Sequence, residues 1–220
     1  MKILLISSSP HKEKSNTFLL AKEVLRGIAE EDAKADFEII HLSEHHIGFC
    51  RHCEECHKKI LNCSVKDSIT VILNKMLEAE GIVLATPNYI NQVTASMKAL
   101  FDRSSHFIHC RRLLGKYIVA AVTSGSGQDK EVLDYIKYYA HTCGAQYSGG
   151  VSSSAYVLKE KTKDAYALGK KMARDIKEKK VFPEQMKVIE AGREHFKRII
   201  LLRKEEWREE YAYWQKSGWL

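Results

Sequence analysis

The 220-residue sequence lacks several features that would mark a membrane-spanning, secreted or nucleoside-triphosphate-binding protein. No apolar run approaches the ~20 residues that a membrane span needs, and the apolar stretch 1–6 is too short for the core of a secretory signal peptide. Neither a Gly-Lys-Ser/Thr sequence nor a dinucleotide-binding glycine fingerprint occurs. We therefore expect a cytoplasmic protein with no membrane partner, in which the six cysteines are thiols or metal ligands before they are disulfides.

The net charge of +7 is not accompanied by a nucleic-acid-binding motif. Positive charge is concentrated between Lys159 and Lys180, where nine basic and four acidic residues occur. These charges interleave with Ala165, Leu168 and Met172 at helical spacing, which predicts the solvated face of a surface helix. Nucleic-acid recognition would need a known reading motif alongside, so no nucleic-acid partner is predicted.

Short apolar runs alternate with segments of helical periodicity along most of the chain. The predicted strands are Lys2–Ser7, Phe37–Leu42, Gly81–Ala85, Tyr117–Thr123 and Gln146–Val151. The predicted helices between and after them are Asn16–Ala29, Ile69–Leu77, Ala95–Phe107, Glu131–Thr142 and the basic segment 159–180. Alternating strands and helices indicate an α/β fold with a doubly wound, five-stranded parallel sheet. Right-handed crossovers favour the flavodoxin-like strand order 2-1-3-4-5, over residues 1–182.

Four loops should meet at the carboxyl edge of this sheet, where ligands of open α/β sheets bind. They begin at Ser7, Ser43, Thr86 and Thr123. The first loop, residues 7–17, combines hydroxyls with the N–H groups of a helix start, which suits an anion. Simple capping of the helix by Ser15 or by its neighbour explains the same residues equally well. The loop 86–91 sets a proline and a tyrosine beside a space that suits a flat ligand.

The loop 47–66 carries the strongest signal, four cysteines spaced C-x2-C-x2-C-x6-C. These are Cys50, Cys53, Cys56 and Cys63. Such spacing lets one loop wrap several thiolates around one metal centre. Three cysteines in succession, separated by two residues each, favour an iron–sulfur cluster. The histidines at 45, 46, 52 and 57 keep zinc as an alternative, and free redox thiols are a third. Cys110 and Cys143 stand alone and are interpreted as small buried hydrophobes.

Three stretches together resemble a known family. They are Ser9-Pro10-His11-Lys12 with Ser15-Asn16-Thr17, then Thr86-Pro87-Asn88-Tyr89, then Met97-Lys98-Ala99-Leu100-Phe101-Asp102-Arg103. The combination is similar to the NADPH-dependent FMN reductase branch of the flavodoxin-like superfamily, over about residues 1–180. The compact cysteine stretch resembles that of iron–sulfur flavoproteins.

The resemblance implies roles for individual residues. The FMN phosphate would be held by Ser9, Ser15, Asn16 and Thr17. One side of the isoalloxazine would be lined by Pro87, Asn88, Tyr89 and Ile90, and the other by Thr123, Ser124 and Gly125. A [4Fe-4S] cluster would be bound by Cys50, Cys53, Cys56 and Cys63. Electron transfer needs no general acid or base, so no separate catalytic residue is predicted.

Residues 183–220 are predicted to form a long helical extension with a stripe of bulky side chains that includes Phe196, Trp207 and Trp214. This stripe needs a surface to bury it. Packing on the same domain is one alternative; packing on a neighbouring subunit is favoured, because reductases that resemble this chain are commonly dimers or tetramers. A homodimer or homotetramer is therefore expected.

The function predicted is that of an oligomeric iron–sulfur flavoprotein, an FMN-dependent oxidoreductase. It would move electrons between a donor such as NAD(P)H, FMN, a [4Fe-4S] cluster, and a redox partner protein or small-molecule acceptor. One alternative is an NAD(P)H-dependent FMN or quinone reductase without a cluster. The other is a zinc-stabilised binding module that keeps the fold without the flavin.

Overall fold

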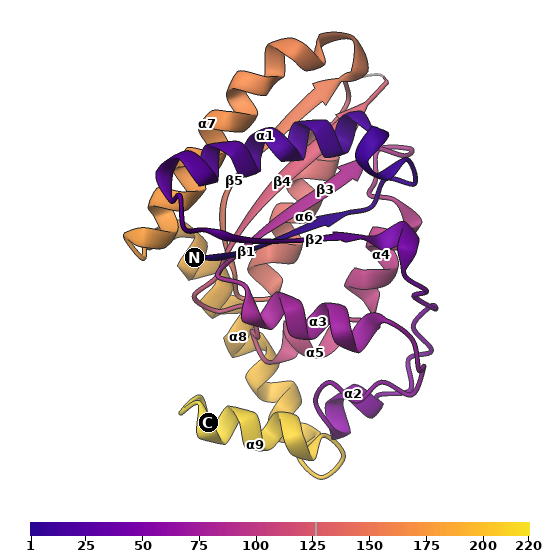
Figure 1. Ribbon diagram of the computed structural model, residues 1–220. Coiled ribbons are helices and arrows are strands. Elements are labelled where there is room, and N and C mark those ends of the chain that lie inside the picture. Colours follow the sequence, from indigo (N-terminus) through magenta and orange to yellow (C-terminus); the bar gives the residue numbers. More distant parts are fainter. Residues whose placement is uncertain (126) are drawn as a thin grey trace.

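Five parallel strands form one sheet in the order β2-β1-β3-β4-β5 in this computed structural model, which describes residues 1–125 and 127–220 (Figure 1). The strands are β1 (Lys2–Ser7), β2 (Asp36–His41), β3 (Gly81–Pro87), β4 (Tyr117–Ser124) and β5 (Gln146–Ser154). The predicted fold class and strand order are confirmed. The bounds of β1 match the prediction, and those of the other strands differ by one to three residues at one or both ends, since sequence patterns define strand ends poorly.

Helices cover both faces of this sheet (Figure 1). The α-helices are α1 (Asn16–Glu31), α2 (Glu55–Lys58), α3 (Ile69–Glu78), α4 (Ala95–Asp102), α5 (Ser105–His109), α6 (Lys130–Thr142), α7 (Leu158–Lys177), α8 (Pro183–Leu202) and α9 (Arg208–Lys216). Short 3-10 turns are η1 (Lys12–Lys14), η2 (Leu42–Glu44) and η3 (Ala155–Val157). Within the described residues, no helix has both the length and the apolar character required to cross a membrane.

Strand β1 shows why the sequence folds in this way. Its side chains alternate between two apolar layers, as the period of a strand requires. Ile3 and Leu5 pack in the layer formed with α1 and α7, whereas Leu4 and Ile6 pack in the layer formed with α3, α4 and α6. All four are at most 1% exposed. A strand buried on both faces needs an uninterrupted apolar run, which is the pattern found in the sequence.

Helices α1 and α7 approach each other through two glycines. A Cβ atom on Gly27 would lie 2.0 Å from the carbonyl oxygen of Tyr166, and one on Gly169 would lie 2.0 Å from that of Val24. Any larger side chain would therefore force the two helices apart. This contact fixes the position of α1, whose first turn begins directly after Ser15.

The predicted helix Ala95–Phe107 is interrupted in the structure. Helix α4 ends at Asp102 and α5 begins at Ser105. At the break, the Ser104 hydroxyl donates to the carbonyl oxygen of Phe101 over 2.8 Å and lies 2.8 Å from the Tyr139 hydroxyl. Side-chain bonds of this kind compete with helix continuation. The break turns Arg103, 4% exposed, toward the cysteine loop, defined as residues 47–66.

The C-terminal extension also differs from the prediction, because it is not one helix. Helices α8 and α9 are joined by a turn at residues 203–207, and two of the three tryptophans of the extension are buried within the same chain: Trp207 is 6% and Trp214 0% exposed. They pack with Cys110 and Ile200, so these rings need no neighbouring subunit to bury them. Burying 150–250 Å² per ring at about 25 cal/mol per Å² outweighs the ~1 kcal/mol per hydrogen bond lost at the turn.

Candidate functional site

A cavity of about 320 Å³ opens at the carboxyl ends of β1, β3 and β4. It is lined by Ser9, His11, Lys14, Ser15, Asn16, Thr17, Pro87, Asn88, Tyr89, Thr123, Ser124, Gly125 and Ala155. Ten of the eleven residues predicted to bind the flavin are in this set. A larger groove of about 690 Å³ between α1 and β2 contains none of those eleven. The loops after three separate strands therefore form one site, at the edge where the topology predicts it.

The first loop brings a helix N-terminus to the cavity. The Ser15 hydroxyl accepts a hydrogen bond from the Phe18 N–H over 3.1 Å and donates to the Lys12 carbonyl oxygen over 2.7 Å, so this side chain caps α1. The Thr17 hydroxyl lies 2.6 Å from that of Thr123 and ties the loop to β4. The first N–H groups of α1, at Asn16 and Thr17, have no partner within the helix, and they face an anion favourably. Capping and anion binding thus coexist here.

The loop after β3 forms the second wall. The Asn88 N–H donates to the Thr123 carbonyl oxygen over 2.7 Å, and its side-chain amide donates to Asp129 over 3.2 Å. Tyr89 is half-exposed above the cavity. Ile90 lies outside the cavity and is 99% exposed, because a tight turn with positive φ at this residue points its side chain away. Sequence spacing alone could not show this turn.

The chemistry of the cavity fits a flat ligand that carries a phosphate. Lys14 lies beside the hydroxyls and the N–H groups of the first loop, where it adds positive charge. The buried Asn88 Oδ1 accepts no hydrogen bond from the described residues. A buried acceptor without a partner is costly, so it invites a donor from a ligand. Gly125 and Tyr89 leave room and apolar surface for a ring system.

The four predicted cysteine ligands line a second, narrow cavity of about 30 Å³, room for roughly two water molecules. All four are free thiols. Cys56 and Cys63 are half-buried, while Cys50 and Cys53 are exposed and form the outer wall. Four thiols are a suitable ligand set for a thiolate-bound metal centre. A cluster needs more space than two water molecules, so Cys50 and Cys53 would have to move outward to admit it.

Arg103 anchors one end of the cysteine loop. Its guanidinium donates to Cys63 Sγ over 3.2 Å and to the Gly48 and Val65 carbonyl oxygens over 2.6 and 3.1 Å. It also pairs with Asp67 over 2.8 Å. Burial alone would raise the pKa of Asp67, but Arg103 and two backbone N–H groups lower it. A buried cation thus lies within hydrogen-bond distance of the Cys63 sulfur, a position that suits a negatively charged metal ligand. Sequence analysis missed both roles, although Arg103 ends one of the quoted stretches.

The environment of Cys53 also favours the thiolate. The Ser64 hydroxyl lies 3.0 Å from its sulfur and, with the Glu55 N–H, lowers the pKa of this thiol. Hydrogen bonds to the charged form have this effect in general. The isolated cysteines are different: burial raises the pKa of Cys143 to about 12 and raises that of Cys110 too. Both are fully buried, as predicted for small hydrophobes.

The four loop thiols are spread out around their cavity. Among the described residues, the group of cysteine, histidine or acidic side chains whose ligand atoms all lie within 4.8 Å is His57, His109 and Glu210. No three of the four loop thiols meet that spacing, whereas thiolates around one zinc ion lie about 3.8 Å apart. Of the four histidines that make zinc an alternative, His52 and His57 line the thiol cavity and the other two do not. His57 directs its Nδ1 to Glu210 over 2.7 Å.

Fold and cavities together define a flavodoxin-like α/β protein with a cofactor-sized cavity at the strand ends and a separate thiol-lined loop. The profile of the family described as NADPH-dependent FMN reductase matches residues 1–157. The chain belongs to this family.

Curated relatives of this chain are named iron-sulfur flavoproteins. One iron-sulfur flavoprotein from Archaeoglobus fulgidus is 42% identical over 128 residues, which cover 57% of this chain and 60% of that protein. The match thus spans under two thirds of that relative's length. A second from the same organism is 27% identical over 230 residues and the full length of both chains. Among solved structures, a flavone reductase shares the fold with a TM-score of 0.61 and 21% identity, covering 80% of this chain and 63% of that one.

Proposed function

We propose that this protein is an FMN-dependent oxidoreductase that moves electrons between a donor, FMN in the strand-end cavity and a [4Fe-4S] cluster in the cysteine loop. The observation that carries the proposal is that one chain holds two separate sets of ligand-binding residues. Ten predicted flavin contacts line one cavity, and four thiols line another. The family match and the names of the curated relatives support both halves.

The chain's residues would bind and tune these groups. When bound, FMN supplies exchange between two-electron and one-electron transfer, and the cluster supplies one-electron transfer. The N–H groups of Asn16 and Thr17, with Lys14, would hold the phosphate. Asn88 Oδ1 would accept a hydrogen bond from the ring system, and Tyr89 would cover it. Arg103 would offset the negative charge of the thiolates and donate to one sulfur.

Donor, acceptor and assembly belong to the same proposal. NAD(P)H is the proposed donor, because the family takes its description from NADPH. A redox protein or a small molecule accepts the electrons. The homodimer or homotetramer remains a prediction, as does the cytoplasmic location.

The deciding experiment is anaerobic purification followed by a visible spectrum and by flavin, iron, sulfide and zinc analysis. We expect one FMN and about four iron and four sulfide per chain. Flavin without iron or sulfide would contradict the cluster half of the proposal and indicate a reductase of the same family whose loop thiols are structural. Stoichiometric zinc in a colourless protein would indicate a binding module and contradict both halves.

A further inference from the structure

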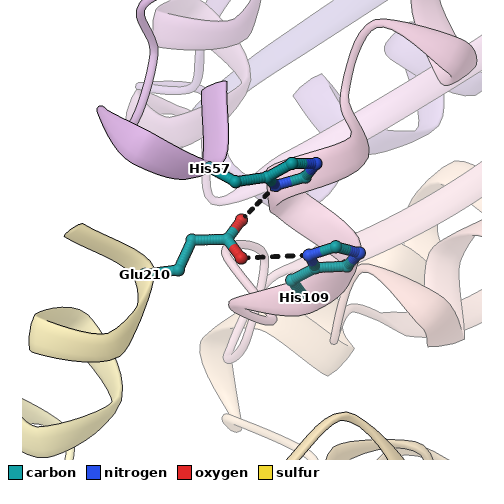
Figure 2. Close-up of side chains that lie close together, drawn as sticks. All are labelled: His57, His109 and Glu210. Carbon is teal, nitrogen blue, oxygen red and sulfur yellow. Dashed lines mark hydrogen bonds and ion pairs between the residues drawn. The ribbon is translucent and has the colours of Figure 1, made fainter. Parts of the chain in front are cut away.

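A buried carboxylate of the C-terminal helix lies between two histidines from distant parts of the chain. Figure 2 shows Glu210 of α9 pointing toward His57 of α2 and His109 of α5. One carboxylate oxygen lies 2.7 Å from His57 Nδ1, and the other lies 3.0 Å from His109 Nδ1. Glu210 is 0% exposed, so its carboxylate is shielded from solvent. Burial raises its pKa, but the hydrogen bonds from His109 and His57 outweigh this and lower it.

The arrangement is that of one acceptor with two donors. The imidazole rings are stacked, 4.5 Å between centroids and 13° between planes, and the Trp207 ring contacts both of them. Each ring points its Nδ1 atom at its own carboxylate oxygen (Figure 2). Each imidazole Nδ1 is thereby occupied by a carboxylate oxygen of Glu210. The group therefore acts as a hydrogen-bonded clamp, called here the Glu210 clamp.

The clamp holds the cysteine loop at its Cys56 side. His57 directly follows Cys56, and its Nε2 lies 3.4 Å from the Ser105 hydroxyl. Further contacts join the same C-terminal segment to this part of the loop: Glu54 pairs with Arg203 and accepts from Trp207 Nε1 over 3.1 Å. Glu209 accepts from the Ile60 N–H over 2.7 Å.

Local backbone preference does not hold this part of the loop. His52, Glu54 and Leu61 all have positive φ, between 50° and 64°, a conformation that costs about 1 kcal/mol or more for residues other than glycine. Helix α2 is a single turn of four residues. Such a segment keeps its shape only when outside contacts impose it. Those contacts come from α9 and from the turn before it.

We propose that Glu210 is a positioning residue for the metal centre: by fixing the His57 ring, it sets the direction of Cys56 toward the other three thiols. This inference rests on the proposed function, because it assigns the cysteine loop to a cluster. It gives the C-terminal extension a role in the redox site, although none of its residues lines the thiol cavity.

The test compares Glu210→Gln with Glu205→Gln, an exposed carboxylate on the same segment, in the full-length holoprotein. Glutamine retains one acceptor oxygen, so one imidazole N–H loses its partner. We expect iron release to 1,10-phenanthroline to accelerate roughly 10- to 100-fold in Glu210→Gln, the range that corresponds to one charged hydrogen bond. The electron paramagnetic resonance signal of the reduced cluster should also shift. Flavin content should match the wild type, and the Glu205→Gln protein should match it in every measurement.

Three results would overturn the proposal. The first is wild-type iron release and an unchanged resonance signal in Glu210→Gln. The second is a parallel loss of iron, flavin and thermal stability, which would make Glu210 a general stabiliser of the fold. The third is a divalent metal that stays bound when all four loop cysteines are serine and is lost on adding Glu210→Gln, which would make the clamp a metal site.

A measurement on iron-free protein separates this inference from the proposed function. Amide hydrogen exchange of residues 54–60 should accelerate in Glu210→Gln and not in Glu205→Gln, whether or not the wild type carries a cluster. If the wild type holds no iron but exchange responds, the cluster assignment fails and the clamp stands as a loop anchor. If exchange does not respond, the positioning role fails.

Discussion

The flavin cavity and the cysteine loop lie in one chain but are held in different ways. The cavity rim is fixed mainly by backbone pairing: the Asn88 N–H donates to the Thr123 carbonyl oxygen over 2.7 Å, and the Ser8 N–H donates to that of Ala85 over 2.9 Å. The cysteine loop has one four-residue helix and is held by buried side chains from elsewhere, Arg103 at one end and Glu210 at the other.

This difference has an energetic consequence. Backbone pairing survives the exchange of a side chain, so the cavity should tolerate most single substitutions outside its direct ligand contacts. Buried charged side chains are more costly to remove, since each leaves an unpaired partner behind. The loop should therefore be the more fragile of the two sites, and its fragility should trace to residues far from it in sequence.

The largest expected effect comes from the four loop cysteines. Serine at Cys50, Cys53, Cys56 or Cys63 should remove most of the iron, because the ligands share one centre and the loop has little structure of its own. FMN should stay bound, since the cavity is built on other strands. Iron, sulfide and flavin analysis of each variant checks this.

Serine at Cys110 or Cys143 is the matched control for those variants. Both side chains are fully buried away from the thiol cavity, so the metal content should match the wild type. Equal iron content in all six variants would contradict the assignment of the loop.

The converse change targets the cavity. Replacing Asn16 with Ala and Thr17 with Val keeps the backbone N–H groups but removes the side-chain amide and hydroxyl, which would also contact the phosphate. This should weaken FMN binding by about 100-fold or more, because each lost charge-assisted contact contributes about 1.5–3 kcal/mol. Iron content should be unchanged. Titration of flavin-free protein with FMN measures the affinity, and a wild-type dissociation constant would remove the phosphate assignment from this loop.

A smaller effect is expected from Arg103→Lys. Lysine keeps the charge but lacks the planar fork that reaches Cys63, Asp67 and two carbonyl oxygens together. Loss of the N–H···S bond should lower the reduction potential of the centre and speed iron release by about tenfold. Redox titration measures the potential. Arg51→Lys, an exposed arginine of the same loop, is the control, and an equal shift in both would deny Arg103 a specific role.

The smallest effect is expected from Ser15→Ala. Loss of the α1 cap should reduce the free energy of unfolding by about 1 kcal/mol and leave iron release unaltered. Urea unfolding of flavin-free protein gives the first quantity. A large change in iron release would show that the two sites are less independent than their construction indicates.

The parts that sequence could predict are those with local signals. Apolar periodicity predicts the strands of the sheet, and the positions of the four loops follow from where those strands end. The resemblance implies that Ile90 lines the ring with Tyr89, whereas a positive φ at Ile90, which has no signal in the sequence, turns its side chain out of the cavity. Glu210 has no local signal, since its partners lie at positions 57 and 109. The helix breaks after Asp102 and Leu202 arise from tertiary contacts that override helical propensity.

The close approach of α1 and α7 at Gly27 and Gly169 limits how this protein can vary. Neither glycine touches the flavin cavity, yet a side chain at either would push α1 away from α7 and move the first turn of α1 with it. In a library of substitutions scored for flavin retention, these two positions should therefore be about as intolerant as the loop that contacts the phosphate. A map of intolerant positions would then outline the supports of the cavity together with its lining.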